Sequence, residues 1–333
     1  MTWLRRTATS LVALCAACAQ GVVIDLQPPP HVETDVAATR PVDADGLREI
    51  LLALPPRRSI GTAAHLRTRE LIEDALRRMG YEPARHAFSW PLAADADLAN
   101  VEVRLPGASP DAPIVVVSAH YDSVADTPGA DDNGSGTAGL LELARRLSGR
   151  RFESEVRLVF FDCEEPGLIG SGNYVTDLSA EELARMVGVI NLETLGFTDH
   201  RAGSQTFPAG ARALFDPGDT GDFLMIVGNE QSAPLASLVA EAMAMEEGPE
   251  FRAEMFSGLP GAGWLLPDSR RSDHARFWDV KVPALLLTDT ANLRSRHYHR
   301  PTDVVETLDL EFLAAAIRGV ERAVERLAVP RDD

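Results

Sequence analysis

Imidazole and carboxylate side chains of this sequence gather just after short apolar runs. His120 and Asp122 follow the apolar run 114–117. Open parallel sheets bind ligands beyond the carboxyl ends of their strands, so His120 stands where a site is expected. A metal-binding imidazole needs an acceptor for its second nitrogen, and Asp122 can supply one. Taken alone, the two residues are equally well explained as a surface ion pair.

Two adjacent glutamates form the most informative pair in the chain. Glu164 and Glu165 follow the expected strand 156–161 after two intervening residues. Neighbouring carboxylates repel one another unless a cation compensates them or one of them takes a proton. The pair therefore indicates that one glutamate binds metal while the other transfers protons.

A third acidic cluster, Asp131 and Asp132, lies in a glycine-rich stretch before the helical pattern of 136–147. Taken alone, this cluster is more typical of an ordinary turn that caps a helix. Its interpretation as a calcium loop lacks the terminal glutamate at the required spacing. This cluster indicates a functional site only when it is considered together with the other clusters.

Two more carboxyl or imidazole groups complete the pattern. Glu193 ends the apolar run 187–192, and His299 is followed four residues later by Asp303. Because the ends of parallel strands share one edge of a sheet, we expect all these side chains to converge there. A ligand set of histidine and carboxylate without thiolate suits zinc.

The elements that position these clusters alternate along the chain between amphipathic helices and continuous apolar strands. This alternation predicts an α/β fold with a mostly parallel, mixed central sheet and helices on both faces. Residues 43–333 are expected to form a single catalytic domain with a loop insertion near 198–222. Helices are expected over 44–54, 63–79, 136–147, 233–245 and 310–327, and strands over 101–105, 114–117, 156–161, 187–192, 223–227 and 284–287.

The first 19 residues have the pattern of a secretion signal. Two arginines precede an apolar run that is too short to span a membrane, and small residues before Gln20 form a cleavage site. Residues 20–42 then form a linker, so we expect an exported protein, periplasmic or secreted, with no transmembrane span in the mature chain. One alternative makes Cys18 a lipidated N-terminal cysteine that anchors the protein to a membrane, and another makes the segment a buried first helix.

Composition excludes several classes of protein. Hydrophobic residues at 45% and charged residues at 25% are ordinary globular values. A net charge of -18 argues against a nucleic-acid partner, which needs a positive footprint. Outside the signal Cys163 is the only cysteine, so the mature chain has no disulfide framework and this thiol is expected to be buried rather than reactive.

Six motifs in order resemble those of the secreted two-zinc aminopeptidases: AHYDS, GADDNGSG, CEEPGLIGS, NLETLG, SDHARFW and YHRPTD. The wider family also contains glutaminyl cyclases, glutamate carboxypeptidase and the inactive ectodomain of the transferrin receptor. The resemblance runs from about Ala44 to Leu310 and implies a zinc-peptidase fold of the phosphorylase/hydrolase type. It also implies a cis peptide bond between Asp131 and Asp132.

The resemblance implies a role for each matching position. Glu164 is the expected general acid/base, and Tyr298 is expected to help stabilise the tetrahedral intermediate. Asp122 is expected to orient His120, and Asp303 lies where a partner for the second imidazole is expected. The implied zinc ligands are His120 and Glu193 for one ion, Glu165 and His299 for the other, and Asp131 between them.

Three positions need separate comment. Many relatives carry aspartate where Glu193 stands, and the longer side chain can still reach the metal. His274 is expected to line the pocket or support the site without binding metal. His297 lies near His299 and is the less favoured ligand of the two.

The resemblance predicts an exported metallopeptidase that hydrolyses N-terminal peptide bonds of peptides or proteins with a two-zinc-activated water. Two alternatives stay open, a one-zinc acyltransferase of the glutaminyl cyclase type and a non-catalytic binding ectodomain. Carboxypeptidase or dipeptidase specificity also stays open. We expect an apolar first residue of the substrate, with the pocket lined by 198–222 and by 254–268, including Phe256, Trp264 and Leu265.

Overall fold

The computed structural model describes residues 40–208, 210–213, 215–245 and 251–331. The expected signal peptide over 1–19, with Cys18, lies outside the described residues, as does the linker up to residue 39. These two expectations and the boundaries of the catalytic domain stay predictions. Within the described residues, no helix has the length and apolar character that a membrane crossing requires.

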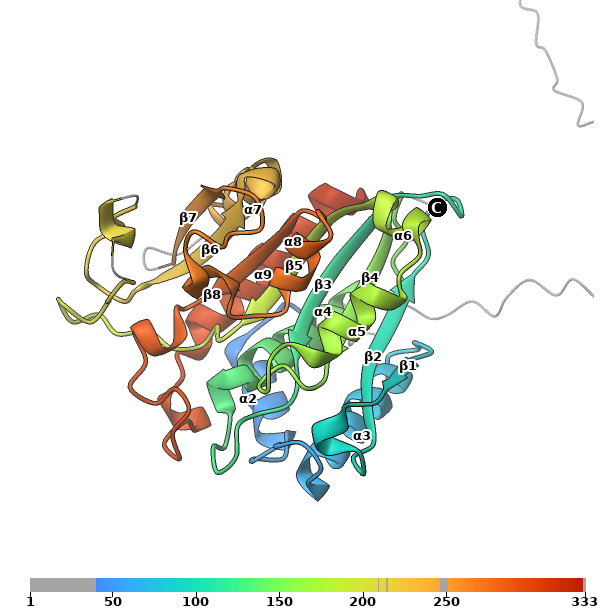
Figure 1. The fold of residues 1–333 in the computed structure, drawn as a ribbon, viewed down its shortest axis with the longest axis horizontal. Coiled ribbons are helices and arrows are strands. Elements are labelled where there is room, and N and C mark those ends of the chain that lie inside the picture. The colour runs from blue at the N-terminus through green and yellow to red at the C-terminus, as the bar shows by residue number, and fades with distance from the viewer. Residues whose placement is uncertain (1–39, 209, 214, 246–250, 332–333) are drawn as a thin grey trace, which may run out of the picture. The chain divides into compact units, whose positions relative to one another are not determined.

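A mixed sheet of eight strands forms the centre of the described part of the chain (Figure 1), in the order β1-β2-β4-β3-β5-β8-β6-β7. The neighbouring strands β4, β3, β5 and β8 are parallel, so their carboxyl ends share one edge. β2 pairs antiparallel with β4, and β6 pairs antiparallel with β8. The bounds are β1 Ala84–Phe88, β2 Leu98–Leu105, β3 Ile114–His120, β4 Glu155–Phe161, β5 Met186–Glu193, β6 Phe223–Asn229, β7 Arg252–Leu259 and β8 Ala284–Thr288.

Helices cover both faces of this sheet. Successive residues of a strand point to opposite faces, and β3 supplies Val115 and Val117 to one core and Ile114 and Val116 to the other. The first core is shared with α2 Ala44–Ala53, α3 Ala63–Arg78, α4 Gly136–Leu147, α7 Ala233–Met243 and α9 Leu310–Ala328. The second is shared with α5 Ile169–Asp177, α6 Ala180–Arg185 and α8 His274–Asp279. The predicted α/β class is confirmed.

Some elements were not anticipated from the sequence. The helices α6 and α8 have six residues each, too few to display a helical period. The edge strands β1 and β7 are only partly buried, so neither shows a clean alternation of apolar and polar residues. In the segment 198–222, the described residues form the short 3-10 helix η3 Ala211–Ala213 and an isolated bridge from Asp199 to Gly221, which fits an ordered loop.

One buried arginine holds the loop that follows β3. The guanidinium of Arg58 donates hydrogen bonds to the carbonyl oxygens of Tyr121 at 2.9 Å, Pro128 at 3.0 Å and Gly129 at 2.7 Å. A further bond reaches the carbonyl of Pro55 at 3.3 Å. Buried carbonyls need partners, so this side chain fixes the backbone on which the next acidic cluster stands.

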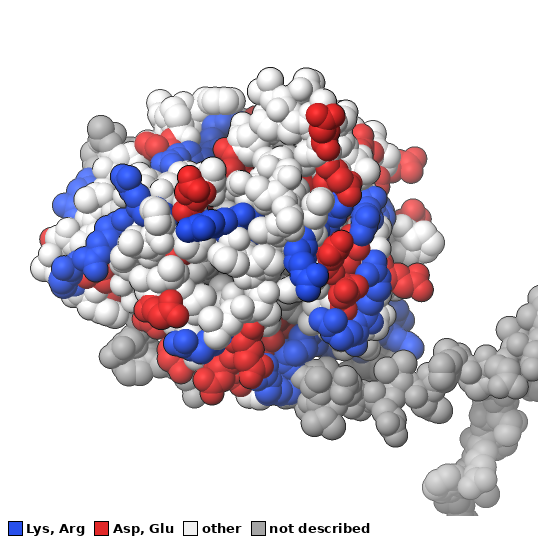
Figure 2. All heavy atoms as spheres, turned by 90° about the horizontal axis from the view of Figure 1, so that it is seen from below, with Lys and Arg blue, Asp and Glu red and all other residues white. Residues whose placement is uncertain are grey.

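The surface is locally mixed in charge despite the net charge of -18. Figure 2 shows Lys and Arg side chains interspersed with Asp and Glu over the lower face of the molecule. Opposite charges placed in this way screen one another at physiological ionic strength.

Candidate metal centre

Two groups of potential ligands lie at the shared carboxyl edge of the sheet. Within each group, the ligand atoms lie within 4.8 Å of one another. The first group contains His120, Glu164 and Glu193, and the second contains Asp132, Glu165 and His299.

Strand pairing brings the first group together. His120 ends β3 and Glu193 ends β5, and the two strands are parallel neighbours with Ala119 opposite Leu192. The His120 Nε2 atom lies 3.2 Å from Glu193 Oε2 and 3.9 Å from Glu164 Oε2. Adjacent parallel strands therefore place an imidazole and a carboxylate side by side before any loop geometry is needed.

Asp132 joins the two groups. Its Oδ1 lies 3.5 Å from His120 Nε2, and its Oδ2 lies 3.0 Å from His299 Nε2. Glu165 completes the second group, with Oε2 at 3.2 Å from His299 Nε2. Among the described residues, no other carboxylate lies within 4 Å of both imidazoles.

The expectation that Asp131 fills this bridging position is corrected by this geometry. The Asp131 carboxylate instead accepts the backbone N–H of Gly196 at 2.9 Å. Burial, together with the neighbouring Asp289 carboxylate, raises the pKa of Asp131 well above its usual value. The expected cis peptide bond between Asp131 and Asp132 is also wrong, because it lies between Asp132 and Asn133.

The role expected of Asp303 changes in the same way. Its carboxylate accepts the backbone N–H groups of Asp131 at 2.8 Å and Asp132 at 3.2 Å. Among the described residues the His299 ring pairs with Asp132 and Glu165 and not with Asp303, so Asp303 supports the bridging aspartate instead. These two bonds fix the backbone amides of the residues that carry both carboxylates.

Asp122 supports both strands that meet at the site. Its Oδ1 lies 3.4 Å from His120 Nδ1, as expected for an orienting carboxylate. The same carboxylate accepts the backbone N–H groups of Glu164 at 3.0 Å and Glu165 at 3.2 Å. It therefore ties the end of β3 to the two glutamates that follow β4.

A chain of buried hydrogen bonds holds Glu193. The Ser272 hydroxyl donates to Glu193 Oε2 at 2.7 Å and accepts from Asn191 Nδ2 at 2.7 Å. The side-chain oxygen Oδ1 of Asn191 in turn accepts a hydrogen bond from the Ser118 hydroxyl at 2.7 Å. The longer side chain of Glu193 is thus held by a specific donor, which the sequence motifs did not reveal.

Ser272→Ala should weaken zinc binding by about 10- to 100-fold, since partners that hold metal ligands typically contribute this much. Competition with a coloured chelator measures the affinity. Ser118→Ala is the matched control, because it removes a hydroxyl from the far end of the same chain and should cost much less. Equal zinc affinities in Ser272→Ala and the unaltered protein would contradict a positioning role for Ser272.

The remaining expected residues surround the centre. The Tyr298 ring stacks on His299 with centroids 3.9 Å apart, and its hydroxyl receives a hydrogen bond from Arg271 at 3.3 Å. His297 bonds Thr302 at 2.9 Å and belongs to neither ligand group. His274 is buried with its Nε2 atom 2.8 Å from the Ser269 carbonyl oxygen, and burial lowers its pKa to about 3.

The donor set fits divalent cations. Burial raises the pKa of Glu164 well above its usual value and that of Glu165 to about 7, the latter helped by the neighbouring Asp132. Asp132 Oδ2 is buried and lies 3.0 Å from His299 Nε2, yet it makes no hydrogen bond of good geometry within the described residues. Buried carboxylates need a compensating charge, and nitrogen and oxygen ligands of this kind suit zinc.

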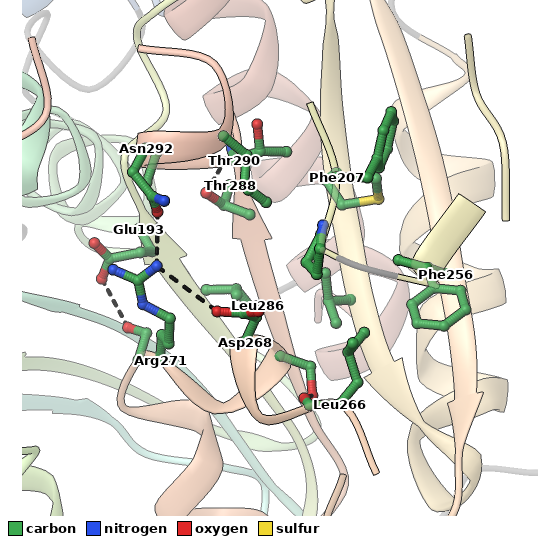
Figure 3. A pocket seen from close by; sticks show the side chains of 18 of the residues that line it. Glu193, Phe207, Phe256, Leu266, Asp268, Arg271, Leu286, Thr288, Thr290 and Asn292 are labelled. Carbon is green, nitrogen blue, oxygen red and sulfur yellow. Dashed lines mark hydrogen bonds and ion pairs between the residues drawn. The ribbon is translucent and has the colours of Figure 1, made fainter. Parts of the chain in front are cut away.

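An apolar pocket opens beside the centre (Figure 3), with Glu193 on its lining. Its volume is about 120 Å³. Its apolar walls come from the 198–222 segment, from β6 to β8 and from the loop after β7, through Phe207, Phe215, Met225, Phe256, Leu266 and Leu286. The expectations for Trp264 and Leu265 are wrong, because these side chains are 68% and 72% exposed and line no part of it.

The fold belongs to the class seen in zinc aminopeptidases. The structure of BSAP, a zinc aminopeptidase from Bacillus subtilis, superposes with a TM-score of 0.67 at 18% identity, covering 86% of this chain and 96% of that one. Porphyromonas gingivalis glutaminyl cyclase superposes with a TM-score of 0.63 at 20% identity, covering 86% and 99%. At these identities the likeness concerns the fold alone.

Residues 100–324 match the model of peptidase family M28, and the chain belongs to this family. It is 36% identical to the uncharacterised Escherichia coli protein YfbL over 220 residues, which are 63% of this chain and 66% of YfbL. It is 48% identical to Bacillus subtilis aminopeptidase YwaD over 89 residues, 27% and 20% of the two chains. The matches therefore span less than two thirds of these relatives.

Proposed function

We propose that this protein is an exported two-zinc aminopeptidase. The observation that carries the proposal is the position of Asp132, whose two oxygens lie 3.5 and 3.0 Å from the imidazoles of two separate ligand groups. A carboxylate between two such groups suits a pair of metal ions that share one ligand.

The residues that would hold zinc divide between the two groups. His120 and Glu193 would hold one ion, Glu165 and His299 the other, and Asp132 would contact both. When bound, zinc lowers the pKa of water and polarises a substrate carbonyl.

Glu164 is the proposed proton carrier. Burial raises the pKa of its carboxyl group well above the usual value of a glutamate, and a carboxylate that can take up a proton is suited to general base catalysis. It lies farther from His120 Nε2 than Glu193 does, at 3.9 Å against 3.2 Å. Glu164 would therefore take a proton from the attacking water and pass it to the leaving amine, while Glu193 would bind metal.

The pocket supports a preference for an apolar first residue. Its volume of about 120 Å³ approaches the ~150 Å³ of an apolar cavity that accepts benzene. A leucyl- or phenylalanyl-sized side chain would bury its apolar surface there, at about 25 cal/mol per Å². The carboxylates of the centre would pair with the free α-amino group, which explains action at N-termini.

Export rests on the signal-like first 19 residues. A Mycobacterium tuberculosis relative, 28% identical over 221 residues, is described as the probable lipoprotein aminopeptidase LpqL. Lipidation at Cys18 is the corresponding alternative for this chain, and mass spectrometry of the mature N-terminus distinguishes it from cleavage before Gln20.

The proposed activity is tested with leucyl-p-nitroanilide and its N-acetylated form. We expect zinc-dependent hydrolysis of the free amine, abolished by a chelator and restored by zinc, with acetylation costing about 10²-fold or more because the carboxylates lose their partner. Elemental analysis should find two zinc ions per chain. Equal rates for the free and acetylated substrates would rule out an aminopeptidase, and cyclisation of glutaminyl peptides without hydrolysis would identify a cyclase instead.

A further inference from the structure

We propose that Arg271 binds the C-terminal carboxylate of the substrate, so that dipeptides and tripeptides are preferred over long polypeptides. This inference rests on the proposed aminopeptidase function and names its substrate class. Arg271 precedes Ser272, the residue that holds Glu193, and both line the apolar pocket. It is the only Lys or Arg among the described residues that line this pocket.

The guanidinium of Arg271 is held at the pocket rim by neutral partners. It donates to Asn292 Oδ1 at 2.6 Å and to the Tyr298 hydroxyl at 3.3 Å. Figure 3 shows it between Glu193, Asn292 and Asp268. The nearest ion-pair partner in the described residues is Asp268 at 3.9 Å, which is too long for a hydrogen bond.

These contacts leave the guanidinium able to take a ligand. It carries five N–H donors in a planar fork, and the two bonds above use only part of them. The side chain is 45% exposed, so solvent and solutes reach it. An arginine with unused donors pairs well with a carboxylate through two parallel hydrogen bonds.

Charge around the pocket favours a carboxylate at this point and nowhere else along the lining. Glu193 and Asp268 are the other charged residues of the lining, and both are acidic. A free carboxylate elsewhere on that surface would be repelled. Arg271 offers the single positive charge that can receive it.

The position of Arg271 limits the length of the substrate. Tyr298 stacks on the ligand His299 and touches Arg271, so one aromatic side chain separates the guanidinium from the metal centre. An extended chain advances at most ~3.6 Å per residue. A C-terminal carboxylate one or two residues beyond the cleaved bond can therefore span the width of the one side chain that separates Arg271 from the metal centre. The C-terminal carboxylate of a long polypeptide lies much farther from the cleaved bond.

An acidic first side chain is the other ligand that an arginine could receive. Such a side chain would have to enter the pocket past Phe207, Phe256 and Leu286. Burying a carboxylate against apolar walls is costly unless it is paired throughout. The C-terminal carboxylate reaches the rim without entering the pocket, and the geometry favours it.

The test compares leucyl-leucine with leucyl-leucinamide, which differ only in the terminal carboxylate. For the zinc-loaded unaltered protein, we expect kcat/KM to be about 10-fold or more higher for leucyl-leucine, since hydrogen bonds to charged groups are the stronger kind. In Arg271→Gln this ratio should fall towards one, with the loss confined mainly to KM for leucyl-leucine. Arg271→Lys should keep part of the preference.

Arg77→Gln is the matched control, because Arg77 is a half-exposed arginine of α3 that pairs with Glu73 and lies outside the pocket lining. It should keep the ratio of the unaltered protein. Failure to hydrolyse either peptide, or the leucyl anilide, would overturn the proposed function itself. Hydrolysis of both at equal kcat/KM, or an unchanged ratio in Arg271→Gln, would overturn only the role of Arg271. An equal fall of kcat on both peptides would also overturn it, by indicating a role in the transition state.

Discussion

Glu164→Gln should lower kcat by about 10²- to 10⁴-fold, the usual contribution of a general acid or base, while the protein keeps both zinc ions. Glutamine keeps the size of the side chain and removes its ability to take a proton. Glu193 lies closer to His120 than Glu164 does and has its own donor in Ser272, so the metal ligands should survive the change. Steady-state kinetics and elemental analysis of the same preparation measure both quantities.

Glu165→Gln is the companion variant, because it alters the neighbouring carboxylate in the same way. Glu165 contacts His299 at 3.2 Å, so this change should lower zinc content as well as activity. Loss of zinc from Glu164→Gln would contradict the assignment of Glu164 as general base and of its neighbours as metal ligands. Glu164 would then be a metal ligand itself, which its place in the first ligand group also allows.

Asp132→Asn should remove nearly all activity together with zinc, whereas Asp131→Asn should keep both. Asp132 is the carboxylate shared by the two groups, so its charge would compensate both of the proposed ions. Asparagine would remove that charge, and buried charges are tolerated only when they are compensated. Asp131 accepts the Gly196 amide and has a raised pKa, and an asparagine oxygen can accept the same hydrogen bond.

The two variants thus control for one another. Each replaces one carboxylate oxygen by an amide nitrogen, and the two positions are neighbours in the sequence. Zinc titration followed by activity at saturating metal separates loss of affinity from loss of chemistry. Retention of full activity in Asp132→Asn with loss in Asp131→Asn would reverse the assignment made from the structure.

Much of the fold followed from the sequence because its signals are strong and local. The β3, β4 and β5 strands are mostly apolar, and a polar cluster lies at or just after the end of each. The carboxyl ends of parallel strands meet at one edge, so convergence of His120, Glu165 and Glu193 needed no knowledge of loops. The family motifs then placed His299, which does not directly follow a strand in the sequence, since β8 already ends at Thr288.

The choice between Asp131 and Asp132 could not be made in this way. Two adjacent side chains are distinguished only by backbone torsions, and Asp132 departs from helical values with φ -101° and ψ 98°. Its amide is also fixed by Asp303, a residue remote in sequence. The partners Ser272 and Arg271 were missed for a related reason, since a serine or arginine carries no signal until the fold shows what it touches.

The hydrogen bonds made by Arg58 affect where a truncated form of the protein can begin. The family match begins at residue 100. The loop that carries Gly129 is nevertheless held by Arg58, which lies well before the start of that match. A recombinant fragment cut to the matched limits would lose every donor that Arg58 supplies to that loop. We therefore expect that a fragment needs Arg58, and the Pro55 carbonyl that it also contacts, to keep this loop in place.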